Sequence, residues 1–499
     1  MHPPSLRASA RATIVALWAT LVAIGVASHV YWRDEVRALT LATEAPSLWD
    51  VPAYVHGEGH PALWYVLLRG AHDIVHVREV LAAIALIFAF AAVVLLVYRS
   101  PLPLWLTALF VFTWPVYEYS VSDRNYGIAM ALMFALAACL TAPRRPYVAI
   151  AALLALLAQT NVHAMLLVPF FVAIVSTDGS RQTRRDRTGT IVCAIVAVAA
   201  CAASIATVYP TRHDLVAGTI ARPTFKTVVK FLVPGAWLTT ERAIDYQAIQ
   251  TSIVLYASCA ILLPDALLVA CAIVSLWLFA LLAIVVYPLS FRHVGVWTSF
   301  LIALAWLRYA RASHGAYAAR LATRRTVVSR RIALGTFGAL LGSYALFEAR
   351  TIVNLSQHPA SDSRTLATIV ATQPRLHDAV LLPEPEEYGE ALPYYIDNPI
   401  YLAREHRFGR TATWSHSTQI RLTLGQLLDD AHDLRRRTDK PVVIVLAEKL
   451  SPGGGDEPVS LGWRFAYAAA DVRRLRRETT ELPGLRRGAF ESFAAYVVR

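Results

Sequence analysis

A pair of acidic residues follows the first long apolar run of the chain. The segment Tyr31-Trp32-Arg33-Asp34-Glu35 stands directly after the run from Ile14 to Val30. Group transfer from a lipid phosphate needs a carboxylate that takes the proton of the acceptor hydroxyl, and cations that stabilise the departing phosphate. The carboxylate has to lie near membrane level, where the lipid carrier holds the reacting carbon. Asp34 and Glu35 meet this requirement; the alternative is that Asp34 only caps a helix beginning at Glu35.

Two later segments offer the cations. The first, Glu118 to Tyr126, contains Asp123 and Arg124, and the second, Tyr287 to His293, ends in Arg292 and His293. The planar guanidinium fork of arginine suits a phosphate better than a single ammonium group does. The alternatives are an Arg–Asp ion pair at the water boundary and, for the histidine, a structural role.

Two further segments belong with these. Gly59-His60-Pro61-Ala62-Leu63-Trp64-Tyr65 combines a histidine with interfacial aromatic residues, which also suit an aromatic belt. The stretch from Pro210 to Gln247 contains Lys226 and Lys230 within a basic cluster that needs an anionic partner if it lies outside the cytoplasm.

The elements that position these residues are membrane helices. The chain has 499 residues, of which 56% are hydrophobic and 16% charged, whereas soluble domains carry about 25% charged residues. Since a span needs about 20 apolar residues, hydropathy predicts roughly eleven transmembrane helices. They are expected near Ala12–Tyr31, Arg78–Val97, Leu102–Tyr119, Asn125–Leu140, Tyr147–Asn161, His163–Val175, Thr190–Tyr209, Ala248–Leu263, Ala266–Tyr287, Val294–Leu307 and Ile332–Phe347.

Lysine and arginine placement predicts the orientation, because basic loops stay in the cytoplasm. The net charge of +12 is therefore read as loop charge and not as a sign of nucleic acid binding. An odd number of spans from a cytoplasmic N-terminus puts the C-terminal part outside. We expect a multi-pass membrane protein with its C-terminal domain on the non-cytoplasmic side.

The chain is thus predicted to have two parts. Residues 1–350 form the transmembrane domain, with outer loops at 32–77 and 210–247; in the first, Val36–Leu41 and Ala62–Leu68 are expected as amphipathic interfacial helices. Residues 351–499 form a small α/β domain. Its elements are strands near Asp378–Leu382, Pro441–Ala447 and Phe490–Val498, a helix over Leu424–Arg437, and a flexible turn at Pro452–Gly455.

The sequence offers no metal-binding motif. The five cysteines lie in apolar runs, without CxxC or Cys/His spacing, so neither a disulfide nor a structural zinc site is predicted. No cofactor is expected with certainty, and a divalent metal stays open.

The acidic pair, the His-Pro-Leu-aromatic segment and the two arginine segments together resemble the GT-C superfamily of integral-membrane glycosyltransferases. The relatives are the protein mannosyltransferases and the aminoarabinose transferases of lipid A. Their usual pattern has two prolines and two tyrosines, where this chain has Ala62 for the second proline and Trp64 for the first tyrosine. The resemblance implies a GT-C-like helical fold and a polyprenyl-phosphate-linked sugar as donor.

The resemblance also implies roles for the site residues. The expected reaction is a single inverting displacement on the periplasmic face, with Asp34 as general base and Glu35 assisting or orienting it. The donor phosphate would be bound by Arg124, Arg292, His293 and Lys226, and His60, Asp123 and Tyr126 are further cavity candidates. The acceptor, whether lipid, glycan or protein, stays open. The alternatives are a transporter or lipid flippase of the cell envelope, and a non-catalytic assembly protein.

Overall fold

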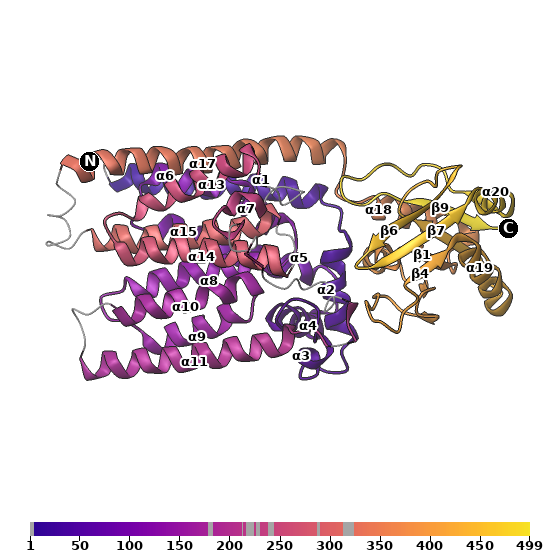
Figure 1. Ribbon diagram of the computed structural model, residues 1–499, viewed down its shortest axis with the longest axis horizontal. Helices are drawn as coiled ribbons and strands as arrows, with labels where there is room; N and C mark the ends of the chain where they lie inside the picture. The colour runs from indigo at the N-terminus through magenta and orange to yellow at the C-terminus, as the bar shows by residue number, and fades with distance from the viewer. Residues whose placement is uncertain are drawn as a thin grey trace.

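The computed structural model describes residues 4–177, 183–211, 213–215, 224–225, 230–237, 244–286, 290–312 and 324–499. A bundle of helices occupies one end of the long axis and an α/β domain occupies the other, with three short helices between them (Figure 1). The N-terminus lies at the end of the bundle remote from the α/β domain, and the C-terminus lies in that domain. The strands thus lie in the C-terminal part of the chain, and the division at residue 350 stays a prediction.

The helices of the bundle are strongly apolar. Five of them are long and apolar enough to cross a membrane, in the segments Arg7–Ser28, Val80–Arg99, Arg184–Val208, Ala266–Val285 and Arg331–Leu355. This makes the chain a multi-pass membrane protein. The bundle comprises α1 (Pro4–Ser28), α5 (Val80–Arg99), α6 (Leu104–Val111), α7 (Trp114–Val121), α8 (Tyr126–Leu140), α9 (Tyr147–Ala158), α10 (Val162–Thr177), α11 (Arg184–Val208), α13 (Tyr246–Cys259), α14 (Ala266–Val285), α15 (Phe291–Arg311) and α17 (Arg324–Gln357), with the 3-10 turns η3 (Pro234–Trp237) and η4 (Ala260–Leu262).

Each predicted span overlaps a helix, but two differ in form. The span predicted over Leu102–Tyr119 is two helices, α6 and α7, because Pro115 in the first turn of α7 cannot donate a backbone hydrogen bond to the preceding turn. The last helix, α17, extends well beyond the predicted Ile332–Phe347 at both ends. The count of about eleven spans stays a prediction.

The three intervening helices come from the first outer loop. They are α2 (Arg33–Glu44), α3 (Val51–Tyr54) and α4 (Leu63–Val75), and α2 packs against α4. Helices are thus present where Val36–Leu41 and Ala62–Leu68 were expected to form them, and both are longer than these apolar centres. Their place at the membrane interface stays a prediction. Half of the second predicted loop, including Lys226, lies outside the described residues.

The α/β domain is built on a four-stranded sheet of order β1-β5-β9-β8, in which β1 and β5 run parallel and the other pairs antiparallel. The three predicted strands and the predicted helix correspond to β1, β5, β9 and α19. The flexible turn predicted at Pro452–Gly455 is wrong in part, because β6 begins at Gly454 and pairs with β7 in a second sheet. The elements are α18 (Ser363–Thr372), η5 (Pro374–Leu376), β1 (Val380–Glu384), η6 (Glu386–Tyr394), β2 (Tyr401–Leu402), β3 (Arg407–Phe408), β4 (Arg421–Thr423), α19 (Leu424–Thr438), β5 (Val442–Leu446), β6 (Gly454–Ser460), β7 (Trp463–Ala468), α20 (Ala469–Glu478), β8 (Thr479–Glu481) and β9 (Ala494–Val498).

The domain is attached to the start of α2 by specific polar contacts. The Tyr31 backbone N–H donates to the Tyr395 hydroxyl at 2.8 Å, and the Ser363 hydroxyl donates to the Tyr31 carbonyl at 2.7 Å. On α2 itself, Arg37 bonds to Glu390 of η6. The beginning of α2 is therefore held between the bundle and the α/β domain.

We expect the crossing of α7 and α15 to be intolerant of added volume. A Cβ on Gly295 would lie 2.4 Å from the Tyr119 hydroxyl oxygen and 2.6 Å from Pro115 Cβ, whereas a Cβ on Gly342 of α17 would meet nothing within 4 Å. Overpacking costs about 1–3 kcal/mol, so Gly295→Ala should lower the midpoint of thermal unfolding of the purified protein. Gly342→Ala is the matched control and should leave it unchanged or raise it; equal effects of the two substitutions would contradict the packing at this crossing.

Candidate active site

Asp34 stands at the start of α2 because the chain turns sharply there. Trp32, with φ −121° and ψ 171°, is the extended residue before the helix. Glu35 reaches back to accept the Trp32 backbone N–H at 3.2 Å, as a glutamate in the first helical turn commonly does. The positive end of the α2 dipole favours the charged form of a carboxylate in this first turn.

Glu35 itself is a buried structural centre. Besides the Trp32 N–H, it accepts the Asp123 backbone N–H at 2.8 Å and contacts His29 Nε2 at 2.9 Å. Burial alone would lower the pKa of His29, but the Glu35 carboxylate raises it above the ordinary 6.5. Glu35 is fully buried, so it is placed to orient the start of α2 and not to touch a substrate.

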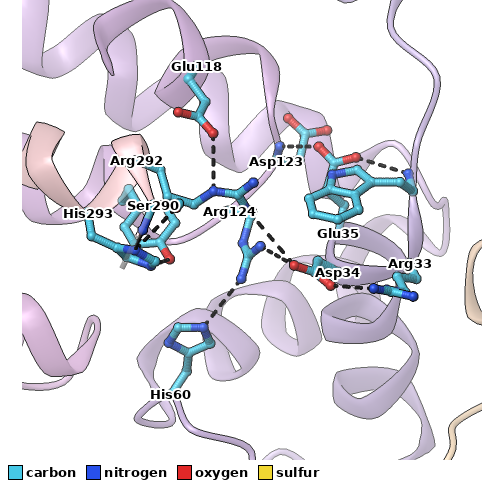
Figure 2. Close-up of polar contacts among 12 residues, drawn as sticks. Arg33, Asp34, Glu35, His60, Glu118, Asp123, Arg124, Ser290, Arg292 and His293 are labelled. Carbon is cyan, nitrogen blue, oxygen red and sulfur yellow. Dashed lines mark hydrogen bonds and ion pairs between the residues drawn. The ribbon is translucent and has the colours of Figure 1, made fainter. Parts of the chain in front are cut away.

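Two arginines from distant parts of the chain converge on Asp34 (Figure 2). Arg124 NH1 lies 2.5 Å from Asp34 Oδ2, and Arg292 NH1 lies 3.9 Å from the same oxygen. Both guanidinium groups face the Trp32 ring, at 6.0 and 5.2 Å from its centroid. The Asp34 side chain keeps 36% exposure. A carboxylate and two cations thus share one accessible place at the end of the bundle next to the α/β domain.

The electrostatics keep Asp34 ionised. Burial pushes the pKa of Asp34 upward, but Arg124, Arg292 and Arg33 outweigh it and hold the pKa below the ordinary 3.8. An arginine fork near an exposed carboxylate can exchange that partner for a phosphate of similar geometry. The site can therefore bind an anion and accept a proton at adjacent atoms.

Arg292 is oriented by α7. Its Nε lies 3.4 Å from Glu118 Oε1, and its backbone carbonyl accepts the Tyr119 hydroxyl. Glu118 on α7 is therefore the counterion of Arg292. Asp123 lies on the Glu35 side, where burial and the Glu35 carboxylate raise its pKa well above the ordinary 3.8. It does not face Asp34.

Both ring nitrogens of His293 have hydrogen-bond partners within the protein. Its Nδ1 accepts the Ser290 backbone N–H at 2.8 Å, and its Nε2 lies 3.0 Å from the Tyr126 hydroxyl. Because both ring nitrogens are engaged, the structure does not support the prediction that His293 donates to a phosphate. The reason is local: the N-terminus of α15 needs an acceptor, and the histidine in its first turn supplies one.

His60 and Tyr126 surround Arg124. His60 Nε2 lies 3.5 Å from Arg124 NH2, and burial together with the Arg124 charge lowers the pKa of His60 to about 3, so the ring is neutral. The Tyr126 ring lies 5.6 Å below the same guanidinium. Both residues therefore position Arg124. Among the described residues no three His, Cys, Asp or Glu side chains lie close enough to hold a metal ion.

Sequence reasoning missed the contacts that hold α2 from the other side. Arg33 lies 3.6 Å from Glu491 and 3.8 Å from Glu387, both in the α/β domain. Arg37 pairs with Glu58 at 2.7 Å as well as with Glu390. The i,i+4 spacing of Arg33 and Arg37 marks one helix face, but nothing in the sequence identifies partners more than 350 residues away.

The fold of the chain is similar to that of the ArnT protein, a likeness of structure between sequences of low identity. The crystal structure of ArnT from Cupriavidus metallidurans in the apo state aligns with a TM-score of 0.51 at 10% identity, over 97% of each chain. ArnT from the same organism bound to undecaprenyl phosphate aligns at 0.46 (12% identity, 97% of each chain). The mycobacterial arabinofuranosyltransferase AftD aligns at 0.35 (12% identity, 99% of this chain and 41% of that one). No family model and no curated protein matches the sequence.

The structure predicts different consequences for the two acidic neighbours. Glu35→Ala leaves buried N–H groups and His29 without their acceptor, which costs about 3–5 kcal/mol for a broken buried pair. We expect a clearly lower midpoint of thermal unfolding, whereas Asp34→Asn should change it little.

The pH dependence gives a second readout. Since the raised pKa of His29 contributes stability below the unfolded value of 6.5 and loses it as pH rises through the folded value, the deficit of Glu35→Ala should be larger near pH 6 than near pH 9. A deficit independent of pH would show that the His29–Glu35 pair does not contribute.

Proposed function

We propose that this protein is a glycosyltransferase that moves a sugar from a polyprenyl-phosphate donor to an acceptor hydroxyl at the outer face of the membrane. The observation that carries the proposal is the meeting of Asp34, Arg124 and Arg292 in one accessible place, beside helices apolar enough to span a bilayer. This arrangement unites a proton acceptor with two phosphate ligands.

In the proposed reaction the acceptor oxygen attacks the anomeric carbon of the donor sugar. The bond between that carbon and the phosphate oxygen breaks, the bonding pair leaves with the polyprenyl phosphate, and the acceptor proton passes to Asp34. A single displacement inverts the anomeric configuration. Arg124 and Arg292 stabilise the charge that develops on the leaving phosphate.

The ion pairs also regulate the strength of the base. A carboxylate held by two guanidinium groups is a weak base, because their charge favours its ionised form. When a donor phosphate draws Arg124 and Arg292 toward itself, that stabilisation decreases and the proton affinity of Asp34 rises. Donor binding thus prepares the base for the acceptor.

The fold supports a lipid-linked donor. ArnT, whose apo structure shares this fold, is a protein that has also been crystallised with undecaprenyl phosphate. We extend this ligand class to the present chain, with the bacterial inner membrane as its location and the α/β domain in the periplasm. The transporter reading is disfavoured because Asp34, Arg124 and Arg292 gather at the ends of helices and not within the long apolar spans.

The decisive variant is Asp34→Asn, which keeps the size of the side chain but removes the proton acceptor. With full-length protein in nanodiscs and its polyprenyl-phosphoryl donor, we expect transfer to fall by at least about 10²-fold. Asp378→Asn, an exposed position of the α/β domain, is the control and should retain full activity. Turnover near that of the wild type in Asp34→Asn would remove this residue from the mechanism.

The proposed sidedness has its own test. We expect a single cysteine placed at the exposed Ser417 to react with a membrane-impermeant maleimide in intact spheroplasts. A cysteine at Arg184, at the opposite end of the bundle, should react only after the membrane is opened. Labelling with the reverse pattern would place the α/β domain in the cytoplasm.

A further inference from the structure

A second cavity adjoins the one that contains Asp34. The Asp34 cavity has a volume of about 170 Å³ and includes Arg124 and His60 in its wall. The neighbouring cavity has a volume of about 250 Å³ and shares with it Arg37, Glu58 and Trp414. The shared residues place the second cavity next to the one that contains Asp34. Together they fall in the range of small-molecule sites, about 300–1,000 Å³.

The second cavity lies on the side of Asp34 away from Arg292, the second of the two proposed phosphate ligands. Arg292 approaches Asp34 but lines neither cavity, whereas Arg37, one helical turn along α2, lines both. The walls come from α2, from the chain after α3, and from the α/β domain through Trp414. A donor bound at the arginines and an acceptor bound here would reach Asp34 from different directions.

The arginines that line the second cavity already have partners. Arg37 pairs with Glu58 and Glu390, donates to the Ala412 carbonyl at 3.1 Å, and stacks over the Trp414 ring at 4.5 Å. Arg407 pairs with Glu405 at 2.7 Å. Neither guanidinium is left as a dedicated site for an anion.

The carboxylates that line the cavity have remaining capacity. Among the described residues, Glu44 accepts a 3.5 Å hydrogen bond from the Tyr54 hydroxyl, and Asp214 accepts from the backbone and hydroxyl of Thr211. Each carboxylate offers about four acceptor positions. Three carboxylates against two paired arginines disfavour an anionic ligand, and they suit a ligand with many hydroxyl donors. The aromatic faces of Trp414 and Tyr54 add apolar contact for a sugar ring.

The geometry points to the second cavity as the acceptor subsite, which binds an uncharged sugar unit and presents one of its hydroxyl groups to Asp34. This inference rests on the proposed function and adds the class of the acceptor: a glycan hydroxyl, and not a phosphate group. It also assigns to the α/β domain, through Trp414, a direct part in recognising the acceptor.

The test measures binding to the full-length protein in nanodiscs, without any transfer reaction. The probes are methyl β-D-glucopyranoside and methyl N-acetyl-β-D-glucosaminide, with glucose 6-phosphate as the anionic comparison and undecaprenyl phosphate as a separate donor-side probe. Ligand-observed NMR gives the affinities. Hydrogen–deuterium exchange shows whether the backbone around Gly57 and Trp414 becomes protected.

The inference expects at least one methyl glycoside to bind with a Kd on the order of millimolar and to protect these two segments. Trp414→Ala and Glu44→Gln should each weaken that binding by about tenfold, and glucose 6-phosphate should bind more weakly than the glycosides. Glu44→Gln is informative where Trp414→Ala disturbs packing, since Trp414 lies 6.3 Å from Trp463 in the domain. Trp49→Ala, at an 88% exposed position, is the matched control and should bind like the wild type.

Three results would overturn the inference. They are tighter binding of glucose 6-phosphate than of both glycosides, protection elsewhere than at these segments, and no glycoside binding at all. Undecaprenyl phosphate binding in the same samples reports on the donor site alone. Its retention in Glu44→Gln is expected, and its absence from the wild type would contradict the proposed function irrespective of the glycoside results.

Discussion

The buried carboxylate of Glu35 is the constraint on which the site depends. It binds His29 at the end of α1, the Trp32 N–H at the start of α2, and the Asp123 N–H in the loop before α8. Three segments are thereby fixed to one group, and a buried donor left without its acceptor costs about 1–3 kcal/mol. The next residue toward the N-terminus, Asp34, consequently has a defined direction, toward Arg124. A side chain that never touches substrate thus determines where the proposed base points.

The two arginines of the site lie near helix ends, where a charge costs less than at the centre of a span. A charged residue at the centre of a span costs about 2.5–3.5 kcal/mol, and Arg124 and Arg292 avoid this cost by preceding α8 and beginning α15. Of their partners, Asp34 is in the first turn of α2, and Glu118 is in the second half of the short helix α7. Trp32 provides an aromatic face to both guanidinium groups, which limits their freedom without neutralising them. The cluster is rigid and close to neutral overall, yet it keeps an exposed carboxylate.

The helices of the bundle and the common end of the three charged site residues could be predicted from the sequence. The length of an apolar run and the charge of a loop are local signals. They located the spans, and the alternation of sides along the chain then brought Asp34, Arg124 and Arg292 to the same end. The predictions that failed depended on the structural surroundings of each residue. The prediction that His293 binds phosphate did not consider that the N–H groups at the start of α15 need an acceptor, which His293 provides. Ser290, three residues earlier, is a common residue at such a helix start. The strand beginning at Gly454 was read as a turn, because its pairing with β7 outweighs the low strand propensity of glycine. The pairing of Arg37 with Glu390 has no sequence signal, since it joins separate domains.

That last pairing changes how the α/β domain should be understood. Arg33 and Arg37 lie on either side of Asp34 on α2, and both are held by carboxylates of the domain, Glu491 and Glu387 for the first and Glu390 for the second. The bundle alone therefore does not determine the orientation of α2. A displaced domain would take both of its carboxylates from Arg33 and would leave Arg37 with Glu58 alone. Arg33, which already lies 3.8 Å from Asp34, would then compete more strongly with Arg124 and Arg292 for its carboxylate. The domain acts on the site by pairing with these arginines, while Arg124 and Arg292 are the partners of Asp34 that come from the bundle.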